Sequence, residues 1–348
     1  MAVTIRDVAK RAGVSISTVS AVINGTKYVS PKLRRRVEEA IEELGYIPSL
    51  IGRALSSQRS SMVAYIIPTI SNPFFSSMIK TVEQNVFASG LGLLVCPTEE
   101  EEEKARRYEA FLVGAHVDGV LISPLSSRPL EEQCRPFLDR DIPVVVLAGS
   151  RTTPHVDAVV LDDASGMRRL TQYLVQLGHR RVAFFGRKRS VTSAGRLAAV
   201  REVLADAGLE LRDDWVVEAP RHARYLPSHE TYRQAKALLG REDRPTAVLC
   251  HNDAVAVGVL QACYDLGLRV PDDVSVTGFD DTLASVTSPP LTTLRVPIED
   301  MAERATGILL DRIAQEKEQY RHAERIVHWF EPELVVRAST GAPEGTSR

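Results

Sequence analysis

The stretch TIRDVAKRAGVSISTVSAVIN, residues 4–24, contains the start and stop signals of two short helices. Thr4 and Asp7 form a variant of the capping box at the first start, and Gly13 is a typical residue at a helix end. Ser15 has the right side chain and position to cap a second helix. Two short helices joined by a glycine-containing turn are typical of a helix-turn-helix unit.

A third helix is expected after Ser30-Pro31, since proline is favoured at the first helical position. It ends at Gly45, and its apolar residues recur at helical spacing: Leu33, Val37, Ile41 and Leu44. In such a unit the second helix, here 16–23, would lie in the major groove of DNA. Spacing alone leaves open a plain three-helix bundle with a serine-rich exposed face.

The formal net charge of −2 conceals an uneven distribution. Residues 1–60 carry ten basic and five acidic side chains, whereas the rest of the chain carries 33 basic and 40 acidic ones. A basic head on an acidic body favours contact between the head and a polyanion.

The composition is that of a globular protein, with 44% hydrophobic and 25% charged residues among 348. No apolar run reaches the roughly 20 residues of a membrane span, and the N-terminus has no apolar export signal. Four scattered cysteines form no CxxC pair, so we expect buried, reduced thiols and a cytoplasmic protein: Cys96, Cys134, Cys250 and Cys263.

The N-terminal segment closely resembles the DNA-binding head of the lactose/purine repressor (LacI/GalR) family of transcriptional regulators. The resemblance continues from residue 29 to residue 48 and then through 49–55, where the family has its hinge helix. It extends more diffusely over almost the whole chain. It implies base contacts at Ile16, Ser17 and Ala21, phosphate contacts at Thr18, Asn24 and Tyr46, and a minor-groove wedge at Leu55.

Two positions depart from the family pattern. Ala21 stands where several members carry Arg or His, and it can contact a thymine methyl but donates no hydrogen bond. Gly52 lies in the expected hinge helix at a position often held by Ala, which weakens that helix by roughly 1 kcal/mol. We therefore expect the hinge helix to form only when it is packed against its dimer mate on DNA.

From Ser61 onward, short apolar strands alternate with helices, which indicates βαβ organisation and parallel sheets. The expected strands are 62–67, 92–96, 119–122, 143–147, 182–185, 215–217, 247–250 and 274–277. The expected helices are 75–89, 99–114, 129–140, 163–177, 194–207, 229–239 and 253–265. Two such series predict an α/β body of two lobes, similar to periplasmic binding proteins, with a cleft at the carboxyl ends of the strands.

The family architecture implies three crossings between the lobes, near residues 161, 290 and 323. The expected domains are a helix-turn-helix domain at 1–48, a hinge helix and linker at 49–60, a first lobe of 61–161 with 291–322, a second lobe of 162–290 with 323–340, and a polar tail at 341–348. The tail lacks the apolar heptads of a coiled coil, so a homodimer is the simpler prediction.

Polar residues gather at the expected strand ends, and Asn72 follows the first strand. The resemblance assigns ligand contacts to Phe74, Thr192, Arg196, Asn252 and Asp280, and more loosely to Tyr225. An Arg with an Asp and an Asn suits a hydroxyl-rich ligand, because charged groups make strong, directional hydrogen bonds. The alternative is that these residues only hold the lobes together.

Three neighbouring features bear on this site. Ala148-Gly149 stands where the family often has a ligand-contacting Asp, so one polar contact is missing. Arg187-Lys-Arg189 favours either an anionic ligand or a solvated loop. The acidic run 99–103 is most simply a solvated helix start.

The sequence thus predicts a DNA-binding transcriptional regulator, a repressor, controlled by a small polar effector such as a sugar. Its expected partners are a pseudo-palindromic double-stranded operator, the effector and a second copy, with no cofactor, metal or membrane. A sugar-binding transport protein is the alternative. Catalysis is disfavoured, since GxxxxGK[ST], HExxH and GxSxG are absent, although Asp162-Asp163 and Asp280-Asp281 could suggest acid–base or metal chemistry. Whether the effector releases or promotes DNA binding stays open.

Overall fold

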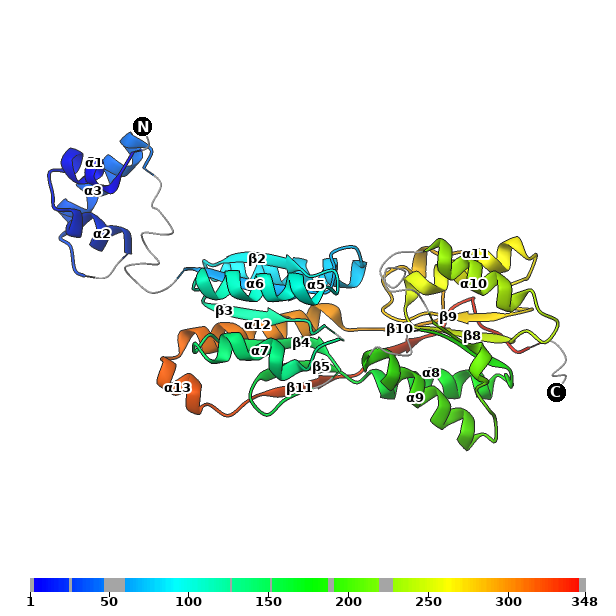
Figure 1. Ribbon diagram of the computed structural model, residues 1–348. Helices are drawn as coiled ribbons and strands as arrows, with labels where there is room; N and C mark the ends of the chain where they lie inside the picture. The colour runs from blue at the N-terminus through cyan, green and yellow to red at the C-terminus, as the bar shows by residue number, and fades with distance from the viewer. Residues whose placement is uncertain are drawn as a thin grey trace. The chain divides into compact units, whose positions relative to one another are not determined.

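The computed structural model describes residues 3–24, 27–46, 60–125, 127–150, 152–186, 191–218 and 228–343 (Figure 1). The chain divides into two compact units, one made of Met1–Met62 with Gly114–Asp118 and the other of the remaining residues. We call the three-helix part of the first unit the head, and the α/β elements from the first strand onward the body.

The head consists of α1 (Ile5–Ala12), α2 (Ile16–Asn24) and α3 (Pro31–Leu44), as the sequence predicts. The Asp7 carboxylate accepts hydrogen bonds from the Thr4 backbone N–H at 2.8 Å and from its hydroxyl at 2.7 Å. Gly13 ends α1 in the left-handed conformation, with φ at 62°. Small and β-branched side chains fill the core of the head: Val8, Ala9, Ala12, Val19, Val22, Val37 and Ala40.

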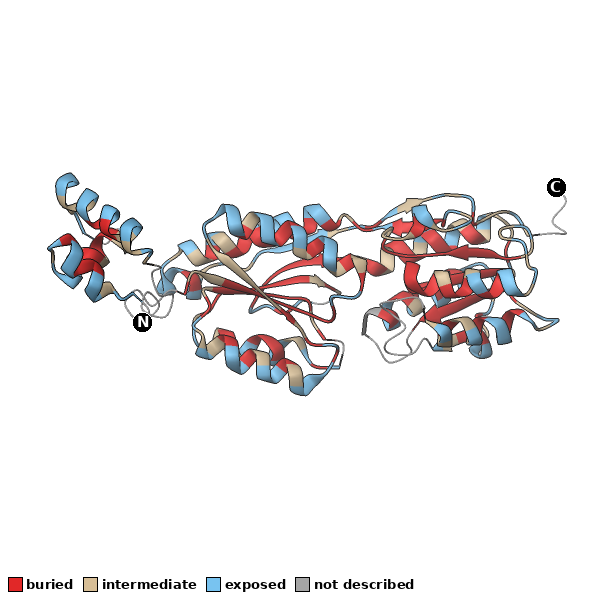
Figure 2. Cartoon of the chain, turned by 90° about the horizontal axis from the view of Figure 1, so that it is seen from above, coloured by how far each residue is buried: buried red, intermediate tan, exposed pale blue. Residues whose placement is uncertain are grey.

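The first lobe of the body is built on a six-stranded sheet in the order β11-β5-β4-β3-β1-β2. Its consecutive elements are β1 (Met62–Ile67), α5 (Pro73–Ala88), β2 (Gly92–Pro97), α6 (Glu102–Gly114), β3 (Gly119–Ile122), α7 (Leu130–Leu138), β4 (Val144–Gly149) and β5 (Asp157–Leu161). The β1–β3, β3–β4, β4–β5 and β5–β11 pairs are parallel. The central strands β1, β3, β4 and β5 are buried and almost uniformly apolar, whereas the edge strands β2 and β11 are partly or largely exposed. Figure 2 shows the helices presenting exposed outer faces.

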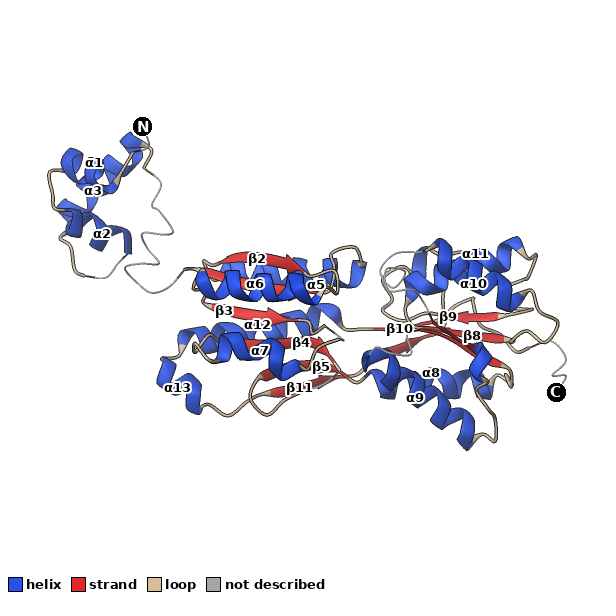
Figure 3. Cartoon of the chain, viewed as in Figure 1, coloured by secondary structure: helices blue, strands red, loops and turns tan. Residues whose placement is uncertain are grey.

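The second lobe has a four-stranded parallel sheet in the order β7-β6-β8-β9. Figure 3 labels two of its strands, β8 and β9, and the helices α8, α9, α10 and α11 that cover the sheet. Its elements are α8 (Asp163–Gln176), β6 (Val182–Gly186), α9 (Val191–Asp206), η1 (Asp213–Trp215), β7 (Val216–Glu218), α10 (His229–Leu239), β8 (Ala247–Cys250), α11 (Asp253–Asp265), β9 (Ser275–Thr277) and η3 (Ala284–Val286). Successive residues of β6 face opposite sides: Phe184 joins one apolar cluster and Phe185 the other. Every predicted strand and helix between 62 and 277 is present, with its ends displaced by at most three residues.

The crossings between the lobes correct two predicted boundaries. The first crossing follows Leu161, as expected. The second lies beyond residue 290, because Leu291 is packed in the second-lobe core and β10 (Thr293–Arg295) precedes α12 (Ile298–Ala314), which packs on the first-lobe sheet.

The third crossing comes later than residue 323. After α13 (Lys317–His322), β11 (Val327–Phe330) pairs with β5 in the first-lobe sheet. The chain then reaches β12 (Glu333–Val335), which pairs with β10 in antiparallel fashion. The first lobe therefore includes β11, which the predicted domain boundaries placed in the second lobe.

The four cysteines are free and buried, as predicted. Burial raises the pKa of the Cys96 thiol to about 11 and that of Cys263 to about 12, which keeps both thiols protonated and unreactive near neutral pH. Among the described helices, none combines the length and the apolar character that crossing a bilayer requires.

A buried histidine anchors the end of the chain to the second lobe. The His179 ring contacts the Thr246 hydroxyl through Nδ1 at 3.0 Å, and the Ser275 hydroxyl and Gly341 carbonyl through Nε2 at 3.0 and 2.9 Å. Gly341 also donates its N–H to the Ser275 hydroxyl. Gly341 is thus part of the folded lobe and not of the tail in which we placed it.

We expect His179 to make the body less stable at mildly acidic pH. Burial lowers the pKa of His179 from 6.5 to about 4, with a smaller opposing effect of the hydrogen bond to Gly341. Since the folded state resists protonation, stability is full above pH 6.5 and declines as the pH falls toward 4. Urea unfolding should lose about 2 kcal/mol between pH 7 and pH 5 through this group alone. The loss should be absent in His179→Gln, and an equal pH slope in both proteins would contradict the assignment.

Candidate ligand site and DNA-binding head

A cavity of about 110 Å³ lies between the two lobes of the body. Loops at the carboxyl ends of β1, β2, β3, β8 and β9 contribute to its wall, together with the first turns of α5 and α8 and with Arg196 on α9. This is the edge at which parallel α/β sheets bind ligands. The described lining residues are Pro68, Asn72, Phe74, Phe75, Glu100, Ser123, Pro124, Ala148, Leu161, Asp163, Arg196, His251, Asn252 and Asp280.

Arg196 is the central cation of this site, and it is 5% exposed. Its Nε and Nη2 donate to Asp163 Oδ1 at 3.0 and 2.5 Å, and its Nη1 donates to the His251 carbonyl at 2.5 Å. The guanidinium carbon lies 3.5 Å from the centre of the Phe279 ring. Three of its five N–H groups thus donate to described residues of the second lobe.

Two asparagines have a structural task in addition to lining the cavity. The side-chain oxygen of Asn72 accepts the Phe74 N–H at 3.0 Å and caps α5, and that of Asn252 accepts the Val255 N–H at 3.0 Å and caps α11. The Asn72 amide N–H₂ group can therefore donate to another partner, and Asn252 has a further interaction with the surrounding protein. Asn72 lies on the first lobe, and its side chain forms a hydrogen bond with the side chain of Asp280 on the second lobe.

Asp280 is a buried carboxylate with an unusual backbone, at φ 100° and 8% exposure. Burial raises the pKa of Asp280 well above its ordinary value, while the Arg196 charge and the Asn72 hydrogen bond act in the opposite direction. A ligand that donates a hydrogen bond to Asp280 would therefore offset part of the free-energy cost of burying this side chain.

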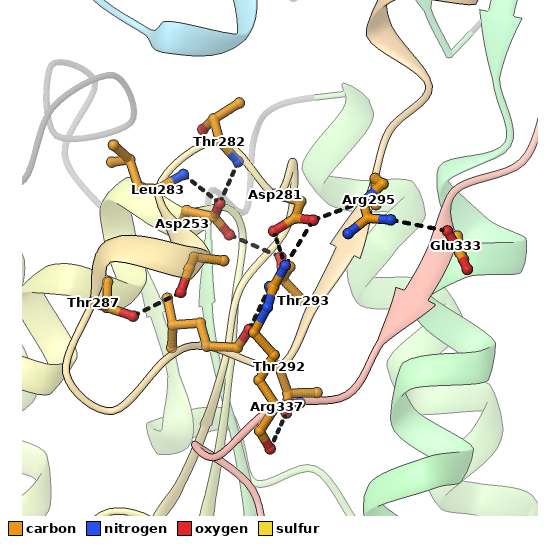
Figure 4. A network of polar contacts seen from close by, with 12 residues as sticks. Asp253, Asp281, Thr282, Leu283, Thr287, Thr292, Thr293, Arg295, Glu333 and Arg337 are labelled. Atoms are coloured by element: carbon orange, nitrogen blue, oxygen red, sulfur yellow. Dashed lines mark hydrogen bonds and ion pairs between the residues drawn. The ribbon is translucent and has the colours of Figure 1, made fainter.

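A polar network holds the loop that carries Asp280 (Figure 4). Asp253 accepts the Thr282 and Leu283 N–H groups at 2.8 and 3.1 Å and the Thr293 hydroxyl at 2.8 Å. A Cβ on Gly278 would lie 2.2 Å from the Asp253 carboxylate, so only glycine permits this approach.

The next residue, Asp281, ties the same loop to the crossing strands. Its carboxylate accepts Arg295 Nε at 2.8 Å and Arg337 Nη2 at 3.0 Å, and Arg295 also contacts Glu333 on β12 at 3.5 Å (Figure 4). These hydrogen bonds hold the loop that carries Asp280 in position before any ligand binds. The segments that connect the lobes take part in the same network.

The structure brings together five of the seven predicted ligand residues: Asn72, Phe74, Arg196, Asn252 and Asp280. The Thr192 side chain, Tyr225 and the run 187–189 lie outside the described residues. Asp162 caps α8 by accepting the Ser165 N–H at 2.9 Å, so it serves the helix as expected of an Asp at a strand end.

Sequence reasoning missed two acidic residues of the site. Asp163 is the first residue of α8, two positions after β5, and its partner Arg196 lies on α9. The solvated-helix interpretation of 99–103 is wrong for Glu100, which is 3% exposed and lines the cavity, because α6 begins only at Glu102.

The second helix of the head presents a small, polar surface. The Ser15 hydroxyl accepts the Thr18 N–H at 3.2 Å and contacts the hydroxyls of Ser17 and Thr18 at 2.7 and 2.9 Å. Ile16 is 44% exposed and Ser17 is exposed, whereas Ala21 is only 7% exposed.

The remaining predicted DNA contacts differ in placement. Thr18 is half-buried, and Tyr46 is half-buried against the core of the head. The Asn24 side chain and Leu55 lie outside the described residues, as does Gly52. The DNA contacts predicted at all these positions stay predictions.

A helix-turn-helix head and a two-lobed α/β body with a ligand cavity define a class of protein: the ligand-responsive DNA-binding regulator. Comparison with family models supports both parts. Residues 4–49 match "Bacterial regulatory proteins, lacI family", and residues 171–340 match a "Periplasmic binding protein-like domain".

Similarity to curated relatives extends over nearly the whole chain. A protein named "HTH-type transcriptional repressor PurR" from Vibrio campbellii is 36% identical over 338 residues, covering 96% of this chain and 97% of the relative. Its counterpart from Aliivibrio salmonicida is 33% identical over 340 residues, covering 97% and 98%.

Solved structures show the same arrangement. The lac repressor dimer bound to operator and the anti-inducer ONPF matches with a TM-score of 0.82 at 27% identity, covering 98% of this chain and all of that one. The transcriptional regulator CelR in complex with cellobiose matches with a TM-score of 0.70 at 30% identity, covering 97% and 99%. The chain belongs to the lacI family of bacterial regulatory proteins, and it is a DNA-binding transcriptional repressor, not an enzyme.

Proposed function

We propose that a dimer of this chain binds a two-fold related operator and that a small, sugar-like effector in the interlobe cavity controls the affinity. The observation that carries the effector proposal is the cavity itself, whose wall includes charged and amide side chains from both lobes. A ligand that contacts both lobes favours one lobe orientation, and it shifts the equilibrium by its difference in affinity for the two states.

The cavity chemistry supports a hydroxyl-rich ligand. Arg196, Asp280, Asn72 and Asn252 line the cavity, and guanidinium, carboxylate and amide groups are the side chains that form directional hydrogen bonds with hydroxyl groups. Phe74 adds an apolar face for a ring. The CelR structure was solved with cellobiose, which makes a carbohydrate a reasonable ligand class for a relative of this fold.

A thermal-shift screen of sugars, sugar phosphates, nucleosides and purines tests the effector proposal. A ligand at about 100 times its dissociation constant should add about 2.7 kcal/mol of stability. A compound that stabilises the protein is then added to an operator titration, which also decides whether the effector releases or promotes DNA binding. No shift of operator affinity with any stabilising compound would contradict the proposal.

Exposed apolar residues support self-association. Tyr264 on α11 is 82% exposed and Val286 on η3 is 80% exposed, and both lie in the second lobe. Contact with a second copy would remove these side chains from water. Two copies of one head on a dimer require two-fold related half-sites in the DNA.

We expect operator binding to depend steeply on salt. The head neutralises phosphates and releases their counterions, so affinity should fall roughly 10³-fold or more between about 50 and 200 mM salt. A mobility-shift titration on the promoter region of the protein's own gene measures this, with a scrambled duplex of the same length as the control. Binding of a monomer to a single half-site, with no dependence on salt, would contradict the proposal.

A further inference from the structure

The end of α1 accepts a hydrogen bond from a side chain of another helix. Arg36 on α3 donates from Nη2 to the Ala12 carbonyl at 2.6 Å. The last four carbonyls of a helix have no partner within the helix, and a cation is the favourable charge beside them. Backbone N–H groups of the turn that follows α1 satisfy two of these carbonyls, at 3.3 and 3.1 Å. Arg36 satisfies a third and thereby connects the end of α1 to α3.

Gly13 makes room for this contact. A Cβ at this position would lie 2.7 Å from Nη2 of Arg36, which is closer than van der Waals contact. Gly13 is also the first residue of the turn from α1 to α2, which ends at Ser15. Ser15 caps α2 by accepting the Thr18 N–H at 3.2 Å. The turn is therefore held at its beginning by Arg36 and at its end by the cap of α2.

The run of three arginines on α3 has members with different partners. Arg34 pairs with Glu38 at 3.9 Å, one turn further along the same helix. Arg35 pairs with Glu39 at 3.0 Å in the same way. Exposed pairs within one helix contribute little. Arg36 instead reaches back to α1, so a run that suggests phosphate contacts for all three arginines contains one residue directed at the turn.

The angle between α1 and α2 matters for DNA binding. In a helix-turn-helix unit the first helix crosses the DNA backbone while the second enters the major groove, so the angle decides whether both contacts form at once. The buried core of the head consists of Val and Ala side chains only, which make few contacts that could fix this angle. A charge-assisted hydrogen bond is strong and directional, and the one from Arg36 acts at the turn itself.

We propose that Arg36 is a positioning residue for DNA recognition: it fixes the turn between α1 and α2, and through the turn the orientation of α2. The inference rests on DNA binding by the head, with α2 as the recognition helix, and it is independent of the effector. Without this hydrogen bond the two helices must be ordered when DNA binds, and the ordering lowers the affinity. A sequence that α2 recognises by base contacts is affected more than one that is held only by its phosphates.

The test compares two variants of the full-length protein that lose the same charge from adjacent positions of α3. An operator is selected from a random-sequence pool with the wild-type protein, and a scrambled duplex of the same length measures non-specific binding. Arg36→Gln should bind the operator about tenfold more weakly, which is the size of one charge-assisted hydrogen bond, and the scrambled duplex within about twofold of the wild type. Its salt dependence should be unchanged, since no phosphate contact is lost. Any loss in Arg35→Gln should be equal on both duplexes.

Gly13→Asn removes the same contact from the other side without changing any charge. Asparagine tolerates the left-handed conformation, while its Cβ would displace the Arg36 guanidinium. It should lose about as much operator affinity as Arg36→Gln, and the double variant should lose no more, because both changes remove one interaction.

Equal losses on the two duplexes in Arg36→Gln, or additive losses in the double variant, would overturn the inference. Full operator affinity in either single variant would do the same. If hydrogen exchange shows that Arg36→Gln has lost the amide protection of the three head helices, the operator affinity of Gly13→Asn decides alone. If the wild-type protein selects no operator, specific DNA binding is contradicted together with the inference.

Discussion

Asp157→Asn is expected to lower the free energy of unfolding of the body by about 3–5 kcal/mol, because it removes one partner of a buried ion pair. Asp157 is fully buried, and its carboxylate accepts Arg312 Nε at 3.0 Å and Nη2 at 2.8 Å. It also accepts the Ile326 N–H at 2.8 Å, while Arg312 donates to the Glu324 carbonyl at 2.6 Å. The ion pair thus connects β5, which begins at Asp157, with the last turn of α12, which carries Arg312. Both residues also hydrogen-bond to the segment before β11.

Thermal unfolding followed by fluorescence measures this effect, and Trp329 on β11 gives a signal from the affected strand. The melting temperature should fall by roughly 6–15 °C for a body of this size. Asp141→Asn is the matched control, because Asp141 also accepts two bonds from one arginine, Arg321, but that arginine is 55% exposed. Its loss should leave the melting temperature nearly unchanged. Equal melting temperatures of Asp157→Asn and the wild type would show that the buried ion pair contributes nothing to the stability of the body.

The same ion pair shows why the lobe boundaries could not be predicted from the sequence. Local apolar runs identify strands and helices, since a buried strand is apolar on both faces, and this located the strands from 62 to 277 except β5, which was not predicted. Which sheet a strand joins depends on distant partners. β11 joins the first lobe through its pairing with β5 and through Asp157, about 170 residues earlier in the chain. β10 and β12 are three residues each, too short for a periodic signal.

In the candidate site, too, some residues could be predicted from the sequence and others could not. Asn72, Asn252 and Asp280 lie in the loops that follow β1, β8 and β9, so the rule that ligands bind at carboxyl ends of parallel strands locates them. Glu100 belongs to a run of five glutamates, and composition predicts solvent exposure for all five. Its burial follows from the positive φ of the Thr98–Glu101 turn, which glutamate residues do not signal. The pairing of Arg196 with Asp163 results from the packing of α8 against α9.

Arg196→Ala is expected to abolish the effector response. The substitution removes the donors aimed at a ligand and leaves the buried Asp163 with the Ser150 hydroxyl, at 2.7 Å, as its remaining described side-chain partner. It also removes the cation that favours the ionised form of Asp280. Allosteric coupling typically changes affinity by about 5–150-fold, and this ratio should fall close to one in the variant. Operator titrations with and without the compound found by screening measure the ratio.

Two further proteins separate the loss of ligand contacts from damage to the fold. Adding Asp163→Asn to Arg196→Ala removes the unpaired buried charge, so it should recover melting temperature without recovering the response. Arg168→Ala is the control on the same pair of helices, since Arg168 on α8 bonds Glu202 on α9 at 3.1 Å with both side chains exposed. It should keep the wild-type response and stability, because an exposed pair contributes little. If folded Arg196→Ala protein still shows the full ligand-induced change in operator affinity, Arg196 acts only in holding α8 and α9 together, and the response must depend on Asp280 and the asparagines.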